Sequence, residues 1–166
     1  MGVPSDKPEF PPLLPEGQHS FTLSELERKC VHAFKESATR EKIFDGVCHL
    51  IDKLSSAGLS GDFWLDGSFL TKKIDPADAD IVLVIDHVQL DDATEEQILI
   101  LDWFGDPGRK LDLLCDNYIA LWYPSDHDRF EHGQTQLTYW NNWWGTARNG
   151  EKKGFAVLNV STGGDK

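Results

Sequence analysis

Residues 65–85 read LDGSFLTKKIDPADADIVLVI, and this stretch decides how the rest of the chain is interpreted. An apolar run ends in the turn Gly67-Ser68, a polar loop follows, and Asp78 and Asp80 open an almost wholly apolar segment. Successive residues of a strand face opposite ways, so the two aspartates share one face of the predicted strand. Carboxylate oxygens are ligands of hard divalent cations, and a turn with unpaired N–H groups and a hydroxyl suits phosphate oxygens. The stretch therefore predicts a phosphate cradle and a metal anchor at opposite ends of one loop.

The same residues resemble the signature of the DNA polymerase beta-like nucleotidyltransferase superfamily. That signature has an apolar residue, Gly and then Gly or Ser, a short spacer, and finally Asp, an apolar residue and Asp or Glu. Gly67-Ser68 and Asp78-x-Asp80 match it with a spacer of nine residues. The chain departs from the signature at Asp66, where an apolar or aromatic residue is usual. This departure places a negative charge beside the predicted phosphate turn.

Members of the superfamily also supply a third aspartate from a later strand, and two residues of this chain are candidates for it. Asp112, within the segment KLDLL, is the better match, and Asp116 is the poorer one. The resemblance implies that Asp78, Asp80 and Asp112 are catalytic and bind two Mg²⁺ ions, with Mn²⁺ as an alternative. Asp112 would complete the binding of the ion that activates the acceptor hydroxyl.

The resemblance further implies that the substrate is a nucleoside triphosphate. Gly67 would let the backbone approach the β- and γ-phosphates, and Ser68 would donate a hydrogen bond to them. Lys72 and Lys73 lie in the same loop and could reach the triphosphate. The alternative, that these two are ordinary exposed lysines, has equal weight.

Together these implications predict one activity. It is the Mg²⁺-dependent transfer of a nucleoside monophosphate to an acceptor hydroxyl on a protein or small molecule, with release of pyrophosphate. The chain is similar to small prokaryotic, minimal members of the superfamily, some of which are paired with toxins, so we expect a protein acceptor or toxin partner. The alternative is a catalytically inactive protein of the same fold that binds a partner as an antitoxin or immunity protein.

Length and composition limit the choices further. A chain of 166 residues predicts a single domain, residues 1–166. No run approaches the roughly 18 apolar residues of a membrane span, and the start of the chain lacks a signal-peptide pattern. Three widely spaced cysteines indicate neither a disulfide framework nor a zinc site. We therefore expect a cytoplasmic protein without membrane contact.

The acidity of the chain is concentrated around the predicted site. Residues 62–120 contain fourteen Asp and Glu but four Lys and Arg, and the whole chain has a formal net charge of −12. Bound cations would offset part of this charge, but the rest repels a polyphosphate backbone. The charge distribution thus argues against a nucleic-acid partner. A basic cluster near the C-terminus, Arg148, Lys152 and Lys153, could contact phosphate or an acceptor, although a solvated turn is favoured.

The order of the predicted elements matches the nucleotidyltransferase fold that the resemblance implies. This fold is of the α/β (α+β) class, with a mixed central β-sheet and helices packed mainly on one face. Apolar periodicity and turn signals predict helices at 22–34, 37–57, 91–103 and around 139–144. They predict strands at 63–66, 78–86, 110–115 and 154–160, and the third of these can continue towards Tyr123 across a bend near Asp116-Asn117. A proline-rich arm, residues 1–20, and a flexible tail, residues 161–166, flank them.

Overall fold

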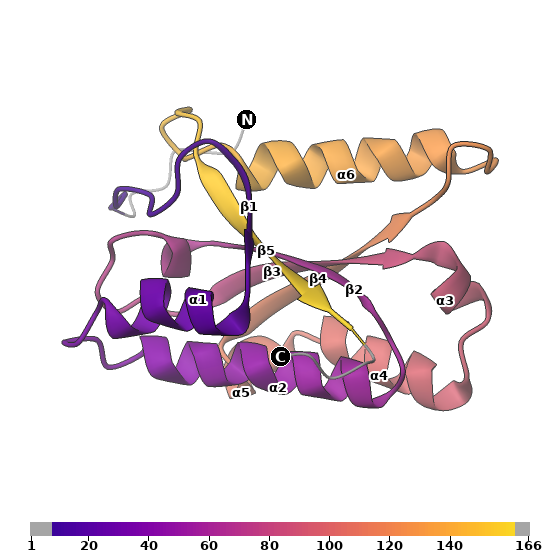
Figure 1. Cartoon of the computed structure of the whole chain (residues 1–166), viewed down its shortest axis with the longest axis horizontal. Helices are drawn as coiled ribbons and strands as arrows, with labels where there is room; N and C mark the ends of the chain where they lie inside the picture. Colours follow the sequence, from indigo (N-terminus) through magenta and orange to yellow (C-terminus); the bar gives the residue numbers. More distant parts are fainter. Residues whose placement is uncertain (1–7, 162–166) are drawn as a thin grey trace.

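The sheet that organises the structure has five strands, and the computed structural model describes it within residues 8–161 of the chain. The strands are β1 (Gly17–Phe21), β2 (Gly61–Asp66), β3 (Ala79–Asp86), β4 (Cys115–Trp122) and β5 (Gly154–Val160). Their spatial order is β1-β5-β2-β3-β4 (Figure 1). β1 is parallel to β5 and β4 to β3, whereas β2 is antiparallel to both neighbours. The predicted mixed sheet is confirmed, and β2, β3 and β5 lie where the sequence predicts them.

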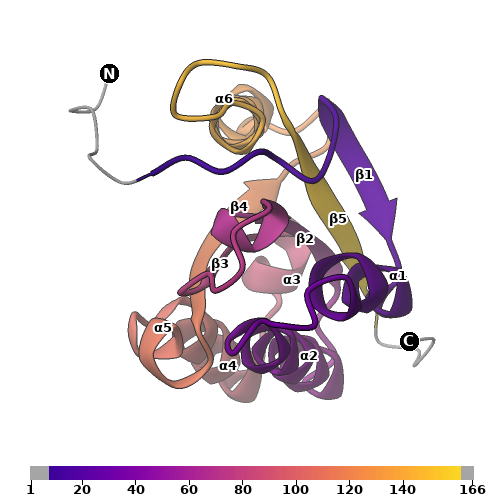
Figure 2. The ribbon, with the colours of Figure 1, turned by 90° about the vertical axis from the view of Figure 1, so that its left-hand side faces the viewer.

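Helices cover both faces of this sheet, and most of them lie on one face. They are α1 (Leu23–Glu27), the π-helical turn η1 (Arg28–His32), α2 (Arg40–Ser56), the 3₁₀ turn η2 (Ser68–Leu70), α3 (His87–Asp91), α4 (Glu95–Gly105), α5 (Gly108–Asp112) and α6 (Phe130–Trp144). α1, α2, α4 and α5 lie on one side of the sheet, and α6 lies on the other (Figure 2). This arrangement agrees with the predicted α+β class. Within residues 8–161, no helix combines the length and the apolar character needed to cross a membrane.

The two faces of β3 contact different parts of the core. Ile81 and Leu83 belong to the larger apolar cluster, on the side of α2. Val82 belongs to a second cluster, which includes Trp144 of α6. Because side chains alternate along a strand, Asp80 shares the α6 face with Val82. The predicted site therefore lies on the face of the sheet that α6 covers.

Several helix ends follow local signals in the sequence. Thr22 and Glu25 form the predicted capping box at the start of α1. Ser37 acts near the start of α2, where its Oγ accepts a hydrogen bond from the backbone N–H of Arg40 at 3.1 Å. Gly58, with φ of 77°, follows the end of α2 as predicted. The helix predicted at 91–103 is confirmed as α4, which begins a few residues later, at Glu95; the short helix α3 before it is not predicted.

The predicted continuation of the third strand towards Tyr123 is confirmed by β4, but the strand predicted at residues 110–115 is wrong. The chain forms α5 there, and β4 begins only at Cys115. A carboxylate oxygen of Asp106 accepts a hydrogen bond from the backbone N–H of Gly108 at 2.6 Å, which favours a helical turn at this point. Leu114 then adopts a φ of 56°, and this left-handed conformation turns the chain into β4. The correction moves the third strand, and with it the candidate for the third aspartate.

Part of the N-terminal arm lies against the predicted site loop. Pro12 and Thr71 form an isolated antiparallel bridge. The backbone N–H of Leu13 donates to the carbonyl of Leu70 at 2.9 Å, and the side chain of Leu14 is buried. The extended, docked form of the arm is thus the observed one from residue 8 onward.

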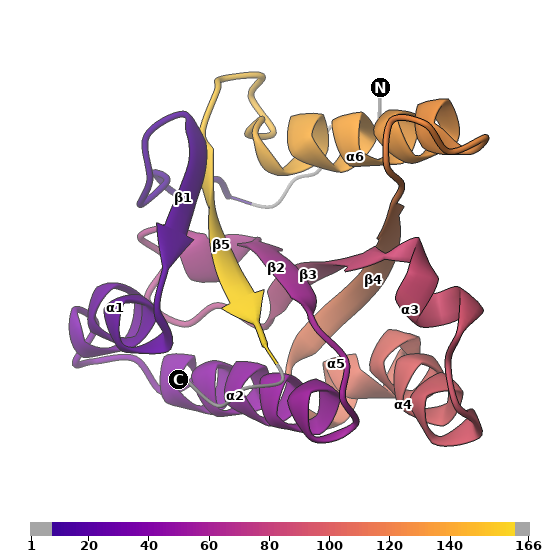
Figure 3. The same ribbon diagram turned by 45° about the vertical axis from the view of Figure 1, so that its right-hand side comes forward.

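The end of the arm forms a strand that the sequence did not predict. β1 runs beside β5 (Figure 3), and its residues are mostly exposed. The first seven residues of the predicted arm and, apart from Ser161, the predicted tail at 161–166 lie outside the described residues.

Candidate active site

Three aspartates lie side by side across the α6 face of the sheet. In the strand register, Asp66 of β2 is paired with Asp80 of β3, and Asp80 is paired with Asp116 of β4. Paired residues on neighbouring strands point to the same face of a sheet and are about 5 Å apart. Asp78 immediately precedes β3 and adds a fourth carboxylate. We name Asp66, Asp78, Asp80 and Asp116 the acidic cluster.

Asp116, rather than Asp112, belongs to this cluster. Asp112 lies on α5 and is exposed, and its carboxylate forms an ion pair with Arg109 at 2.9 Å. Its predicted position on a strand is wrong, because the strand begins later in the chain. Asp116 faces Asp80 directly in the register. Asp116 is therefore the better placed candidate for the third aspartate, although Asp112 is the better match in sequence.

Asp80 carries a strongly perturbed carboxyl group. The pKa of Asp80 is raised from 3.8 to about 7, first by burial and then by the negative charges of Asp78, Asp66 and Asp116, and Lys110 opposes this shift. Burial and neighbouring negative charges disfavour the ionised form of this carboxyl group, and a nearby cation would stabilise that form. Perturbation of this kind is common at functional sites.

Lys110 partly balances the charge of the cluster. Its Nζ lies 3.5 Å from Oδ2 of Asp78 and 3.3 Å from Oδ2 of Asp116. The side chain extends from α5 and is 52% exposed. Asp78, followed by Asp116, raises the pKa of Lys110. An ammonium group thus already stands between two of the carboxylates.

Gly67 brings the predicted phosphate turn into contact with the cluster. Its φ of 87° is left-handed, which glycine adopts at little cost. A Cβ at this position would lie 2.5 Å from Oδ2 of Asp80, closer than real Cβ contacts. Ser68 follows directly at the start of η2 and is half-buried. The two halves of the sequence motif are therefore neighbours in space, and Gly67 is needed where the turn approaches Asp80.

The two loop lysines differ in their surroundings. Lys72 is exposed, and its backbone N–H donates to the carbonyl of Pro11 at 2.9 Å. The ammonium of Lys73 lies 5.7 Å from the ring centroid of Phe10 in the N-terminal arm. Its carbonyl accepts a hydrogen bond from Arg40. The Lys72 side chain is thus more available for phosphate than that of Lys73.

Arg40 organises this loop, and sequence reasoning missed it. The residue is fully buried at the start of α2. Its guanidinium donates to the backbone carbonyls of Cys30, Phe69, Thr71 and Lys73. Burial lowers the pKa of Arg40. An arginine whose partners are main-chain carbonyls leaves no pattern of residue types, so the sequence offered no signal for it.

Asp66 has a buried partner that offsets its charge. Lys153 places its Nζ 2.8 Å from Oδ1 and 2.7 Å from Oδ2 of Asp66, and the two side chains are 12% and 6% exposed. Burial raises the pKa of Asp66, and Lys153 opposes that shift. The ammonium of Lys153 thus offsets the negative charge of Asp66 beside the Gly67 turn. Arg148 and Lys152, from the same basic cluster in sequence, are exposed.

Aromatic side chains border the acidic cluster. The hydroxyl of Tyr118 donates to Oδ2 of Asp116 at 3.4 Å, and its ring centroid lies 4.8 Å from that of Trp140 on α6. Tyr139 and Trp143 stack on each other with centroids 6.3 Å apart, and both are more than half exposed. Exposed rings of this kind can stack with a nucleobase.

The donor chemistry of the cluster suits Mg²⁺, although the carboxylates are not drawn together around a centre. Within residues 8–161, no three side chains of His, Cys, Asp or Glu are grouped closely enough to hold a metal ion. Lys110 stands between Asp78 and Asp116. Carboxylate oxygens are nevertheless the ligands that Mg²⁺ takes. Asp78, Asp80 and Asp116 are therefore the residues that would hold it.

Comparison with protein families places most of this chain in one of them. Residues 8–159 match the family described as "Family of unknown function (DUF6932)". The chain belongs to this family. The matched region of the DUF6932 protein contains the whole acidic cluster, the Gly67 turn and every helix of the described structure. No curated protein and no solved structure matched the chain.

Proposed function

We propose that this DUF6932 protein is a Mg²⁺-dependent nucleotidyltransferase. It would transfer a nucleoside monophosphate from a nucleoside triphosphate to an acceptor hydroxyl, on a protein or small molecule, and release pyrophosphate. One observation carries the proposal. The carboxylates of Asp80 and Asp116 are paired across β3 and β4, and the Gly67 turn approaches Asp80 so closely that no side chain fits between them. The nucleotidyltransferase fold is part of the same proposal.

The residues divide the work as follows. Asp78, Asp80 and Asp116 would hold Mg²⁺, which supplies neutralisation of the triphosphate charge when bound. The backbone at Gly67-Ser68 would bind the β- and γ-phosphates. The acceptor oxygen forms a bond to the α-phosphorus, and the bond from that phosphorus to the bridging oxygen of the leaving pyrophosphate breaks. Asp116 takes the proton of the acceptor hydroxyl; in the structure this carboxylate already accepts a hydrogen bond from a hydroxyl, that of Tyr118.

Label transfer tests the proposal directly. The protein is incubated with each of four α-³²P-labelled nucleoside triphosphates and Mg²⁺ or Mn²⁺. Acceptors are the chain itself and the proteins encoded beside it. We expect Asp80→Asn and Asp116→Asn to lose transfer by about 10²-fold or more. Asp112→Asn is the matched control, and it should retain transfer. Transfer that persists in Asp78→Ala/Asp80→Ala would contradict the catalytic assignment.

A second candidate function has a specific observation in its favour. The ammonium of Lys110 already pairs with Asp78 and Asp116, as expected of a scaffold that no longer binds metal. On this reading the protein is an antitoxin or immunity protein, and its acidic surface binds a basic partner. Calorimetric titration with nucleotide and Mg²⁺ separates the two candidates. Metal-dependent nucleotide binding favours the enzyme, and absence of binding together with a tight complex with a basic, genetically adjacent protein favours the second candidate.

A further inference from the structure

Strand β4 forms one edge of the sheet, and the middle of this edge is open. Within residues 8–161, β4 has β3 on one side and no strand on the other. Successive side chains of a strand point to opposite faces, yet Tyr118 and Ile119 are both exposed, at 39% and 37%. The helices on the two faces of the sheet therefore leave the middle of β4 uncovered.

The pairing of β4 with β3 shows which backbone groups of β4 point outward. The backbone N–H of Ala79 donates to the carbonyl of Leu114 at 3.0 Å, and Ala79 is paired with Cys115 in the register. In a parallel ladder, successive residues of a strand alternate between bonding to the neighbouring strand and pointing away from it. The even-numbered residues of β4 therefore bond to β3. Asn117 and Ile119 direct their N–H and C=O groups to the free edge.

These outward groups of Asn117 and Ile119 have no hydrogen-bond partner within the part of the chain that the structure describes. The side-chain Oδ1 of Asn117 is also buried without a partner. Nearer the end of β4, helix α6 approaches the edge, because a Cβ at Gly133 would lie 3.3 Å from the carbonyl oxygen of Leu121. The open stretch is therefore Asn117 to Ile119. Its unpaired N–H and C=O groups are a template for another strand.

The other edge strand, β1, is protected in ways that β4 is not. β1 has five residues, whereas β4 has eight. Pro15 stands two residues before β1 and cannot donate a hydrogen bond to a further strand. Short strands, prolines and charged side chains are the usual protection of a sheet edge. The one charged residue of β4, Asp116, is paired with Lys110 at 3.3 Å, so the open stretch is uncharged.

The helices beside β4 add apolar surface to this edge. α4, α5 and α6 all contact β4, the first two on one face of the sheet and α6 on the other (Figure 2). They expose large apolar side chains, among them Leu99, Leu111, Tyr139 and Trp143. A stable interface buries roughly 800 Å² of each partner, which is more than a short strand supplies alone. Apolar side chains next to the open stretch can supply the rest.

We propose that β4 is the interface of a two-fold homodimer, in which the β4 strands of two copies pair antiparallel and join the two sheets. Asn117 of each copy exchanges N–H and C=O hydrogen bonds with Ile119 of the other. Tyr118 then faces its own counterpart at the two-fold axis, and aromatic cross-strand pairs are favourable. A contact of this symmetry uses the free edge of both copies and closes after two. The proposal does not depend on the proposed enzymatic activity.

The charges of the edge favour a second copy over a basic partner. The chain carries a net charge of −12, but the open stretch is uncharged and would gain little from a basic strand. In the antiparallel pair, each Asp116 lies opposite Ala120 of the other copy. The two Asp116 carboxylates are then about 14 Å apart along the strands, and salt screens exposed charges beyond about 8 Å.

Self-association of the full chain tests this inference. Sedimentation velocity is measured on the wild type and on Ile119→Lys at a series of concentrations up to about 0.5 mM. We expect the wild type to reach twice the mass of one chain. Ile119→Lys introduces two ammonium groups into each interface, so it should weaken self-association by about 10²-fold or more. A wild type that keeps the mass of one chain at every concentration would overturn the inference and leave the edge to a strand of a different protein.

Ile74→Lys is the matched control. Ile74 is 48% exposed and lies in the loop before β3, outside β4 and the helices that contact it. We expect its dimer dissociation constant to stay within about twofold of wild type, because a distant exposed charge is screened. Equal weakening by Ile74→Lys and Ile119→Lys would show that added charge, rather than the β4 edge, controls association. A dimer that persists unchanged in Ile119→Lys uses another surface, and the inference then fails.

Hydrogen exchange of the wild type provides a test that needs no variant, in case Ile119→Lys does not fold. Amide exchange is compared between a dilute sample, in which the monomer predominates, and a concentrated one. We expect the amides of Asn117 and Ile119 to exchange at least about 10-fold more slowly in the concentrated sample, because they become hydrogen-bonded. The amide of Val157 in β5, inside the sheet, should exchange equally in both. Equal exchange of Asn117 and Ile119 in the two samples would overturn the proposal.

Discussion

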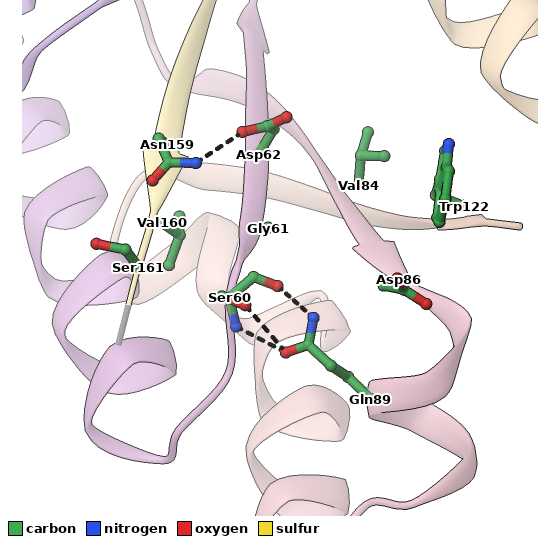
Figure 4. A pocket seen from close by; sticks show the side chains of 10 residues that line it. All are labelled: Ser60, Gly61, Asp62, Val84, Asp86, Gln89, Trp122, Asn159, Val160 and Ser161. Carbon is green, nitrogen blue, oxygen red and sulfur yellow. Dashed lines mark hydrogen bonds between the residues drawn. The ribbon is translucent and has the colours of Figure 1, made fainter. Parts of the chain in front are cut away.

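The two ends of strands β2 and β3 carry the same kinds of residue and arrange them differently. At one end Asp66 is paired with Asp80, whereas at the other end Asp62 is paired with Val84. The second end opens into a groove between the strand ends, which also contains Asp86 (Figure 4). We name it the Asp62 groove. Both ends therefore have carboxylates on the α6 face of the same two strands, and only one end brings them face to face.

Each carboxylate of the Asp62 groove has a local partner. Asp62 accepts a hydrogen bond from the side-chain amide of Asn159 at 3.2 Å. Asp86 accepts one from the backbone N–H of Val88 at 3.0 Å and begins α3. In the acidic cluster, by contrast, Asp80 is surrounded by three other carboxylates. Strand register, rather than residue type, therefore decides which carboxylates face one another: Asp80 faces Asp66 and Asp116, whereas Asp62 faces Val84.

The largest difference between the two ends is expected in the free energy of unfolding, when one carboxylate at each end loses its partner. Lys153→Met leaves the buried carboxylate of Asp66 without its ion pair, and we expect a loss of about 3–5 kcal/mol in the free energy of unfolding. Asn159→Ala removes the neutral partner of Asp62, and the loss should be about 1 kcal/mol or less. Urea denaturation at pH 7 measures both. Similar losses in the two variants would show that the two ends do not differ in this way.

The contact between Gly67 and Asp80 can be isolated with a second glycine. Gly67 has φ of 87° and ψ of −168°, a combination that is essentially restricted to glycine, and Gly150 also has φ of 87°, so the backbone is strained by alanine at both positions. At Gly67 the added Cβ also meets Asp80, whereas at Gly150 nothing lies within 4 Å. We expect Gly67→Ala to destabilise the protein by about 1–3 kcal/mol more than Gly150→Ala. In an Asp80→Ala background the difference should shrink, because the nearest atom, Oδ2 of Asp80, is then absent; an unchanged difference would show that the side-chain contact is not the cause.

The raised pKa of Asp80 predicts a slope of stability with pH. The native state holds the Asp80 proton up to about pH 7, whereas the unfolded chain releases it near 3.8. Native protein therefore binds more protons between these values, and stability falls as the pH rises through this window. Asp80→Asn cannot ionise, so its slope should be shallower and its stability at pH 8 higher by about 1–2 kcal/mol. Denaturation at a series of pH values measures the slope, and identical slopes would refute the assignment.

Sequence reasoning succeeded where a structure depends on neighbours along the chain. The apolar run of β3 and the adjacent Gly67 turn were predicted because each is a local pattern. The start of β4 was placed too early because KLDLL is compatible with a strand, whereas the Asp106 side-chain hydrogen bond and the left-handed Leu114 accompany a helical turn there. The choice between Asp112 and Asp116 followed from that error.

Residues with distant partners were beyond the reach of sequence patterns. Lys153 pairs with a residue 87 positions away, and Arg40 binds main-chain carbonyls that any residue type provides. β1 lacks an alternating apolar pattern, and pairing with β5 defines it. These contacts join segments that are far apart in the chain, so no local pattern in the sequence predicts them.

The smallest effect on stability is expected for Asp62→Asn, and this variant tests the difference between the two strand ends most directly. Asp62→Asn keeps the size and shape of the side chain at the groove end, so its stability should change by no more than about 0.5 kcal/mol. Like Asp80→Asn, it replaces one acidic side chain by a neutral amide. If register selects the metal ligands, Asp62→Asn should leave Mn²⁺ affinity within about twofold of wild type, because Val84 rather than a second carboxylate faces Asp62. Equal weakening of Mn²⁺ binding by Asp62→Asn and Asp80→Asn would mean that the cation responds to the acidity of the whole sheet face. The pairing of Asp80 with Asp116 would then not determine where the cation binds.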